Sequence, residues 1–307
     1  MLGEVMPLGW YVRLFLRPVA CIELLHREIL LREQDVWTQQ EIVSRWHEGA
    51  SLVPQILRYW RENGTARFAL TQVAVVDYAM PAMSGIRVLG ELTRWSGARI
   101  LLTGRADEQL AVSAFNRGLI NQFIPKQSPD IRLRLTTAID SLRDRPDAHH
   151  QHIWHGTLSP AQHALLEDPL IAQALETIAA KAGWIEHVVI GMPFGVLALD
   201  AQGAVGWLQL ELAENLHELA EIALSQGWDP STVQEIRLGK KLIDLELGLA
   251  LGPSHQPQPQ ECLLLAGETG CLYAAAFAVN EAFCPGLTHS FSKFLLAHSN
   301  RAVQDDC

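Results

Sequence analysis

The stretch Val73-Ala-Val-Val-Asp-Tyr-Ala-Met-Pro-Ala-Met-Ser-Gly85 decides the fold expected for the first half of this chain. It begins with a short β-branched run without alternation, which is typical of a strand buried on both faces, and Asp77 ends that strand. Similar runs follow at Arg99–Leu102 and Gln122–Ile124. Helical patterns come after the three runs, at Ile86–Trp95, Glu108–Asn116 and Ile131–Leu142. This alternation predicts a parallel sheet covered by helices on both faces.

A polar residue stands at the end of each predicted strand. Asp77 carries a carboxylate, Thr103 a hydroxyl and Lys126 an ammonium group. One helix and its two loops fit between successive members of this set. The functional crevice of an open parallel sheet lies at the carboxyl ends of its strands, so we expect the three side chains to converge on one rim.

These residues resemble the signature of a known family. Asp77-Tyr-Ala-Met-Pro81-Ala-Met-Ser-Gly85 is similar to the acceptor aspartate, apolar residue, Met-Pro and Gly of the CheY-like receiver domains of two-component response regulators. Leu102-Thr103-Gly104 is similar to the threonine strand end of that family, and Lys126 to its lysine. The resemblance covers roughly residues 11–142 and implies a flavodoxin-like, doubly wound α/β fold.

The resemblance also implies a phosphorelay chemistry. Asp77 would accept a phosphoryl group from a histidine kinase and form an aspartyl-phosphate. Lys126 and a Mg²⁺ ion bound by Asp77 would offset the negative charge that spreads over the phosphoryl oxygens. Thr103 would hydrogen-bond the bound group, and Phe123, in the position of the family's switch aromatic, would then swing inward.

The chain departs from the family pattern at its beginning. A receiver normally starts with a strand ending in two adjacent acidic residues, which hold Mg²⁺ with the acceptor, and no such strand precedes Tyr11. The β-prone segment Tyr11–Leu16 and the helix expected at Pro18–Leu31 resemble the second strand and second helix of the family, so the domain looks N-terminally incomplete. Either the start is truncated or misplaced, or this is a degenerate receiver that works without magnesium. The intact Asp77, Thr103 and Lys126 favour the first explanation, and the Mg²⁺ site is conditional on the missing acidic pair.

Two local features also differ from the minimal receiver domain. Extra helical patterns at Thr38–His47 and Ser51–Arg61 precede the strand of Asp77, and Asn63-Gly64 marks the end of the second. Lys126 is followed by Gln127 rather than by proline. We expect a trans peptide bond there, because a cis bond before a residue other than proline costs about 2.5–4 kcal/mol.

The second half of the chain predicts a different architecture. A linker rich in Asp, Pro and His, residues 146–159, separates the receiver-like domain (1–145) from a domain at 160–307. Ser159-Pro160 and Asp168-Pro169 each pair a helix-capping residue with proline at the first helical position. Later strands are expected at His187–Ile190, Val196–Leu199, Val205–Leu210, Glu261–Ala266 and Cys271–Val279, the last two as a hairpin, and later helices at Ala213–Ser225, Pro230–Leu238 and Leu287–His298. This order predicts an α+β domain with an antiparallel sheet.

Three features of this half leave alternatives open. Gly191–Gly203 is reminiscent of the start of a PAS-type sensory domain, and equally of an ordinary hairpin turn. Asp244 and Glu246 are expected on the solvated face of a helix end. Four histidines form a dense cluster, which indicates either a metal site or a polar linker: His149, His150, His152 and His155. No Cys or carboxylate repeats beside them at a fixed spacing, which favours the linker.

Composition excludes several function classes. The net charge of −10 and the absence of clustered Lys/Arg runs argue against nucleic-acid binding. The longest purely apolar run, Cys271–Val279, is too short to span a bilayer. Five cysteines without a CxxC pair and without a secretory signal indicate reduced thiols in the cytoplasm. No motif of a hydrolase, nucleotide-binding loop or metalloprotease appears, so we expect no enzymatic activity.

The sequence therefore predicts a two-component response regulator with a regulatory output domain that does not bind DNA. The expected partners are a histidine kinase, a small ligand or a protein partner for the C-terminal domain, and a second copy of the chain in a homodimer. The alternative is an adaptor, a pseudoreceiver whose surface binds proteins without phosphorylation.

Overall fold

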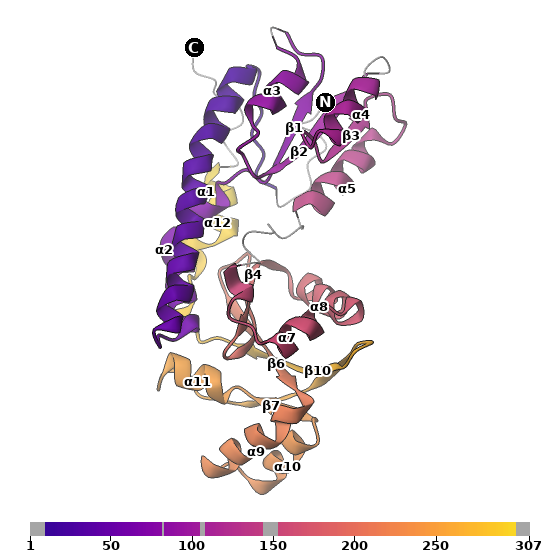
Figure 1. Ribbon diagram of the computed structural model, residues 1–307. Helices are drawn as coiled ribbons and strands as arrows, with labels where there is room; N and C mark the ends of the chain where they lie inside the picture. The colour runs from indigo at the N-terminus through magenta and orange to yellow at the C-terminus, as the bar shows by residue number, and fades with distance from the viewer. Residues whose placement is uncertain (1–9, 82, 105–107, 144–152, 299–307) are drawn as a thin grey trace. The chain divides into compact units, whose positions relative to one another are not determined.

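The computed structural model describes residues 10–81, 83–104, 108–143 and 153–298 (Figure 1). These residues form two compact units. The first takes in the described residues of Met1–Trp37, Ala66–Asp147 and Leu295–Cys307, and the second those of Thr38–Thr65 and Ala148–Phe294. No helix within the described ranges is long and apolar enough to cross a membrane.

The first unit is built on a three-stranded parallel sheet of order β1-β2-β3. Its strands are β1 (Val73–Asp77), β2 (Ala98–Thr103) and β3 (Gln122–Pro125). Its helices are α3 (Gly85–Glu91), α4 (Glu108–Asn116), α5 (Ile131–Arg143) and the first part of α1 (Pro18–His47). The strand pattern predicted a parallel sheet covered by helices, and the family resemblance implied a flavodoxin-like fold; the structure confirms both.

Helices cover both faces of this sheet, as its continuous apolar runs require. On one face, Val76 and Leu101 belong to a buried cluster with Leu25 of α1 and Leu89 of α3. On the other face, the cluster combines strand residues with residues of α5, namely Ile100, Leu102, Ile124, Leu135, Ala138 and Leu142. Alternate residues of each strand therefore enter separate cores.

The segment Tyr11–Leu16 is not the strand that its alternation predicted. The structure assigns it no regular secondary structure, and among the described residues the sheet ends at β1 on this side. An ion pair holds the segment instead: Nη2 of Arg13 lies 2.6 Å from Oε1 of Glu28, whose side chain is 4% exposed. Alternation alone does not make a strand when no neighbour offers hydrogen bonds.

The first two helices are longer than their sequence patterns indicated. Pro18–His47 forms one continuous helix rather than two segments, and α2 (Leu52–Phe68) continues through Asn63-Gly64. Gly64 is buried, and the amide of Asn63 donates to the carbonyl of Tyr59 at 3.2 Å. Packing and this local bond override the turn preference of the dipeptide.

The second unit contains a five-stranded antiparallel sheet of order β4-β5-β6-β10-β9 and a small sheet of β7 and β8. The strands are β4 (Trp184–Gly191), β5 (Phe194–Asp200), β6 (Val205–Leu212), β7 (Lys241–Ile243), β8 (Pro259–Glu261), β9 (Leu263–Ala266) and β10 (Cys271–Ala278). The helices are α7 (Pro160–Leu166), α8 (Pro169–Ala182), α9 (Leu216–Ser225), α10 (Pro230–Arg237), α11 (Leu245–Leu251) and α12 (Phe291–His298), the last of which ends in the first unit. The predicted α+β architecture and the β9–β10 hairpin are confirmed.

Asp168 joins two distant parts of this unit. Its Oδ1 caps α8 by accepting the backbone N–H of Leu170 at 3.0 Å, as the Asp-Pro pair predicted. Its Oδ2 also accepts the backbone N–H groups of Glu268 at 2.6 Å and Thr269 at 3.0 Å, in the turn of the β9–β10 hairpin. A Cβ added at Gly267 would lie 2.6 Å from Cγ of Asp168, so the turn approaches the carboxylate as closely as only glycine allows.

Candidate functional site at the carboxyl edge of the parallel sheet

Asp77 ends β1, and its carboxylate has two bonding partners. Oδ2 lies 2.5 Å from Nζ of Lys126, and Oδ1 accepts the backbone N–H of Ala79 at 3.1 Å. The Asp77 side chain is 35% exposed, so a small reagent in solution has access to it. The carboxylate is therefore charge-paired and still open to solvent.

Thr103 ends β2 beside Asp77. Asp77 is in register with Leu102, which places Thr103 one residue further along the neighbouring strand. Thr103 is fully buried, and its hydroxyl Oγ1 has no hydrogen-bond partner among the described residues. A buried hydroxyl without a partner is costly, and it leaves an unused hydrogen-bonding group at this edge.

Lys126 directly follows β3, and the backbone sets its position. Its N–H donates to the carbonyl of Thr103 at 2.8 Å, so the loop after β3 is attached to the end of β2. The peptide bond to Gln127 is trans, as expected, since the one cis bond in the described chain is Met192-Pro193. The structure thus brings Asp77 and Lys126 into contact and places Thr103 on the strand between them.

Gly85 allows the chain to fold back against the end of β1. A Cβ at this position would lie 2.3 Å from the backbone oxygen of Asp77. The N–H of Gly85 donates to the carbonyl of Tyr78 at 2.9 Å, and Ser84 caps α3 by accepting the N–H of Arg87. This close approach gives the glycine of the Asp77–Gly85 signature a physical reason.

Phe123 lies in β3, three residues before Lys126, in register with Leu101. Its side chain is half-buried and packs against the same core cluster as Tyr78 and Met80. Its predicted role as a switch that swings inward stays a prediction.

The described residues do not form a dedicated magnesium site. Asp77 supplies one carboxylate, which already pairs with the ammonium of Lys126. No group of three His, Cys, Asp or Glu side chains in the described chain is placed to hold a metal ion. Mg²⁺ prefers several oxygen ligands in octahedral geometry, so this donor set does not fit it unaided.

Two of the other sequence hypotheses concern histidines and acidic residues of the second half. His149, His150 and His152 lie outside the described residues, while the ring of His155 packs edge-on against that of His163, with centroids 5.0 Å apart.

The expectation that Asp244 lies on a solvated helix face is wrong. Its side chain is 2% exposed, and Oδ2 lies 2.6 Å from Nε2 of His255.

The Asp244–His255 pair had no clear signal in the sequence. His255 stands in a proline-rich loop with no partner at a regular spacing, and Asp244 looks like any polar residue at a helix start. The apolar Leu-Glu-Leu-Gly-Leu-Ala-Leu of α11 was the available hint, because a helix this apolar is buried along with the residue before it.

No known family model matches this chain, and no curated protein matches it either. Among solved structures, the response regulator LqsR of Legionella pneumophila superposes with a TM-score of 0.65 at 18% identity, over 92% of this chain and 86% of that one. FixJ from B. japonicum gives a TM-score of 0.24 at 27% identity, over 39% of this chain and 64% of that one. An adenylate cyclase from Rhodopirellula baltica gives 0.21 at 28% identity, over 23% and 52%. The two partial superpositions carry no weight, whereas the first shows that this chain has the fold of that response regulator over nearly its whole length.

Proposed function

We propose that this chain is a response-regulator-like signalling protein whose first unit accepts a phosphoryl group on Asp77. The observation that carries the proposal is the convergence of three groups at one sheet edge. They are the Asp77 carboxylate, the Lys126 ammonium 2.5 Å away, and the Thr103 hydroxyl, which has no hydrogen-bond partner among the described residues. The shared fold with the response regulator LqsR supports the same assignment. A histidine kinase is the expected phosphodonor.

The chain's own residues supply most of what the transfer needs. A carboxylate oxygen of Asp77 attacks the phosphorus atom, the bond from phosphorus to the donor's leaving group breaks, and that group departs with the electron pair. Lys126 moves its ammonium from the carboxylate toward the incoming phosphoryl oxygens and offsets their charge. The hydroxyl of Thr103 then gains the hydrogen-bond acceptor that it lacks among the described residues.

The second candidate function is a pseudoreceiver adaptor that binds proteins without phosphorylation. It is favoured by the donor set at the site, because among the described residues Asp77 belongs to no group of three His, Cys, Asp or Glu side chains that could hold a metal ion. In an adaptor, the Asp77–Lys126 pair would be a permanent structural contact. The surface of the first unit would then bind its protein partner in a single conformation, without a phosphorylated state.

A phosphorylation assay separates the two candidates. The chain is incubated with acetyl phosphate, with and without Mg²⁺, and its intact mass is measured. We expect a mass gain of one phosphoryl group in the wild type and none in Asp77→Asn. Asp130→Asn, which removes an exposed carboxylate from the same unit, is the matched control and should behave as wild type. A wild type that gains no phosphoryl group under either condition would exclude phosphotransfer and leave the adaptor.

The second unit is proposed as the output of the protein. Its role is regulation through a ligand or a protein partner, without enzymatic activity. The net charge of −10 supports an output that does not bind DNA. We further propose that the protein acts in the cytoplasm and that phosphorylation changes its association with itself or a partner. Sedimentation of phosphorylated and unphosphorylated chains measures that change, and identical sedimentation with and without partner would contradict it.

A further inference from the structure

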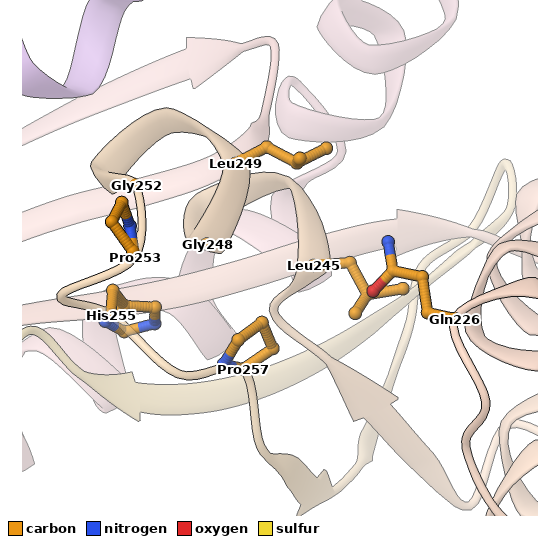
Figure 2. Close-up of a pocket in the computed structure, with 8 residues that line it drawn as sticks. All are labelled: Gln226, Leu245, Gly248, Leu249, Gly252, Pro253, His255 and Pro257. Atoms are coloured by element: carbon orange, nitrogen blue, oxygen red, sulfur yellow. The ribbon is translucent and has the colours of Figure 1, made fainter.

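Exposed apolar side chains of the described chain occur in two different settings. In the second unit, Leu249 lines an open hollow between α11 and the loop that follows it (Figure 2). No described Asp, Glu, Lys or Arg side chain lines that hollow, so its lining does not indicate the charge of a partner. On α1, by contrast, Leu30 and Trp37 are 63% and 73% exposed, and charged residues accompany them along the helix.

Leu30 and Trp37 belong to one exposed face of α1. An α-helix turns by about 100° per residue, so residues three, four, seven or eleven positions apart lie on the same side. Leu30 and Leu31 precede Gln34 by four and three positions, and Trp37 follows it by three. All four side chains are exposed. An exposed tryptophan beside leucines is typical of the residues that contribute most to the affinity of a protein interface.

The charged residues on this face are arranged symmetrically around Gln34. Glu23 lies eleven positions before it and Arg45 eleven positions after it, whereas Arg27 lies seven before and Glu41 seven after. The four charged side chains are exposed, and all belong to the one continuous helix α1. Positions at equal distances on opposite sides of Gln34 therefore carry opposite charges.

This pattern is complementary to a second copy of itself. When two such helices pack antiparallel about a two-fold axis at Gln34, each residue meets the one at the same distance on the other side. Glu23 then faces Arg45 of the second copy, and Arg27 faces its Glu41. Within one helix Arg45 and Glu41 already form an ion pair, so acidic and basic side chains alternate in a network at each end of the contact. Parallel helices would instead place every charge against a like charge.

We propose that α1 is a homodimerisation surface, on which two copies of the chain pack antiparallel through the face around Gln34. Trp37 of one copy lies against Leu30 and Leu31 of the other at the centre of the contact, and the charge networks form its ends. The four charges of this face sum to zero, so a strongly basic or acidic partner gains no net attraction, whereas the same face of a second copy does. The inference does not depend on phosphorylation of Asp77.

The length of the face sets the expected affinity. From Glu23 to Arg45 it is about 33 Å long at 1.5 Å per residue, and a helix is about 10 Å wide. The contact is therefore smaller than a standard interface, and we expect a reversible dimer with a dissociation constant on the order of 10–100 µM. Sedimentation of the unphosphorylated full chain over this concentration range measures it. A chain that stays monomeric well above the range would overturn the proposal and leave this face to another partner.

The apolar centre is tested with matched leucines. Leu30→Ala should weaken association several-fold, and Trp37→Ala about tenfold or more. Leu133 of α5 is 67% exposed, and α5 packs on the other face of the parallel sheet, so Leu133→Ala is the control and should associate as the wild type does. A loss in Leu133→Ala without a loss in Leu30→Ala would place the contact on α5 and refute this surface.

The antiparallel register is tested by charge reversal. Arg27→Glu should weaken association about threefold to tenfold, because the new carboxylate faces Glu41 of the second copy. Adding Glu41→Arg should restore the affinity to within about twofold of the wild type, since opposite charges face each other again. A second charge reversal does not repair a misfolded chain, so this rescue reports the contact itself. A double variant that associates as weakly as Arg27→Glu alone, or an Arg27→Glu variant that associates as the wild type does, refutes the register.

Discussion

Asp77 and Asp168 both stand at the end or start of a regular element, yet their carboxylates have different surroundings. Asp168 is 3% exposed and accepts backbone N–H groups from two elements, α8 and the β9–β10 turn. The Asp77 side chain is 35% exposed, and its partners are one backbone N–H and one flexible ammonium group. A carboxylate whose oxygens accept only backbone donors is fixed in the fold, whereas the carboxylate of Asp77 is exposed and bonds to one side chain that can move away from it.

The largest effect is expected from Asp168→Ala. The change leaves the N–H groups of Leu170, Glu268 and Thr269 without their acceptor and separates α8 from the hairpin turn. Chemical denaturation should show a large loss of stability of the second unit, and hydrogen exchange should accelerate along Leu263–Ala278. Asp229→Ala is the matched control, because Asp229 caps α10 through bonds to the nearby Ser231 and Thr232 and joins no second element. Equal losses from the two variants would mean that the link to the hairpin contributes nothing.

The same carboxylate predicts an acid response. The backbone N–H of Thr269, with those of Leu170 and Glu268, holds the pKa of Asp168 below its usual range. Its stabilisation is therefore present above the ordinary carboxyl pKa of about 4 and is lost as the pH falls through the lower folded value. Asp168→Asn should flatten this acid-side loss in a series of denaturation curves.

A buried carboxylate with few donors should behave in the opposite way. Glu211 is 8% exposed, and its Oε1 accepts the amide of Gln209 at 3.0 Å. Burial raises its pKa to about 7, opposed by Gln209 and Asn215 and assisted by the charges of Glu246 and Glu218. Because the folded pKa is raised, the stability is present below the unfolded value and is lost as the pH rises through about 7.

Glu211→Gln should remove that loss. We expect the change in unfolding free energy between pH 5 and pH 8 to differ from that of the wild type by about 2–3 kcal/mol, with the variant the more stable at pH 8. Denaturation of both proteins at the two pH values measures it. Parallel pH profiles would show that Glu211 does not titrate in this range.

Substitution of Gly85 tests whether the close approach of this residue to the backbone oxygen of Asp77 is needed for the stability of the first unit. Gly85→Ala places a Cβ against the backbone oxygen of Asp77 and should destabilise the first unit by about 1–3 kcal/mol while slowing formation of the phosphoryl adduct. Gly90→Ala, in the same helix with open space around the added Cβ, is the control and should leave stability unchanged or higher. Equal behaviour of the two variants would show that the backbone moves freely at Gly85.

The smallest stability effect is expected at Lys126. Its side chain is 40% exposed, and ion pairs at such surfaces contribute about 0–1 kcal/mol. Lys126→Met should therefore change the unfolding free energy by no more than that, while it slows adduct formation on Asp77 more strongly, since the ammonium is needed where charge develops. A Lys126→Met variant that is strongly destabilised would contradict the predicted minor role of Lys126 in stability. A variant that forms the adduct at the wild-type rate would contradict its proposed role in the transfer.

In the first unit, the site could be predicted from the sequence because each polar residue directly follows a recognisable apolar strand. Asp77, Thr103 and Lys126 each follow an apolar run, and the parallel sheet brings the ends of such runs together. The segment Tyr11–Leu16 was misassigned, because a strand needs a neighbour as well as alternation. The stop expected at Asn63-Gly64 failed for a similar reason, since burial of Gly64 outweighs local preference.

The second unit shows which kind of information a single sequence lacks. The helix cap at Asp168 was visible because its partner is two residues away. Its bonds to the hairpin turn, and the pairing of Asp244 with His255, depend on where distant segments meet. Local periodicity carries no information on such long-range contacts, so neither could be predicted from the sequence.

The double use of Asp168 also bears on the order in which this unit folds. The residues that it joins are separated by 100 positions in the chain, and closing so long a loop carries an entropic cost that grows with its length. During synthesis α8 emerges long before the hairpin that completes the bonding of its cap. Until the hairpin is made, Oδ2 of Asp168 can bond only to water, and docking of the hairpin turn completes the hydrogen bonding of this carboxylate.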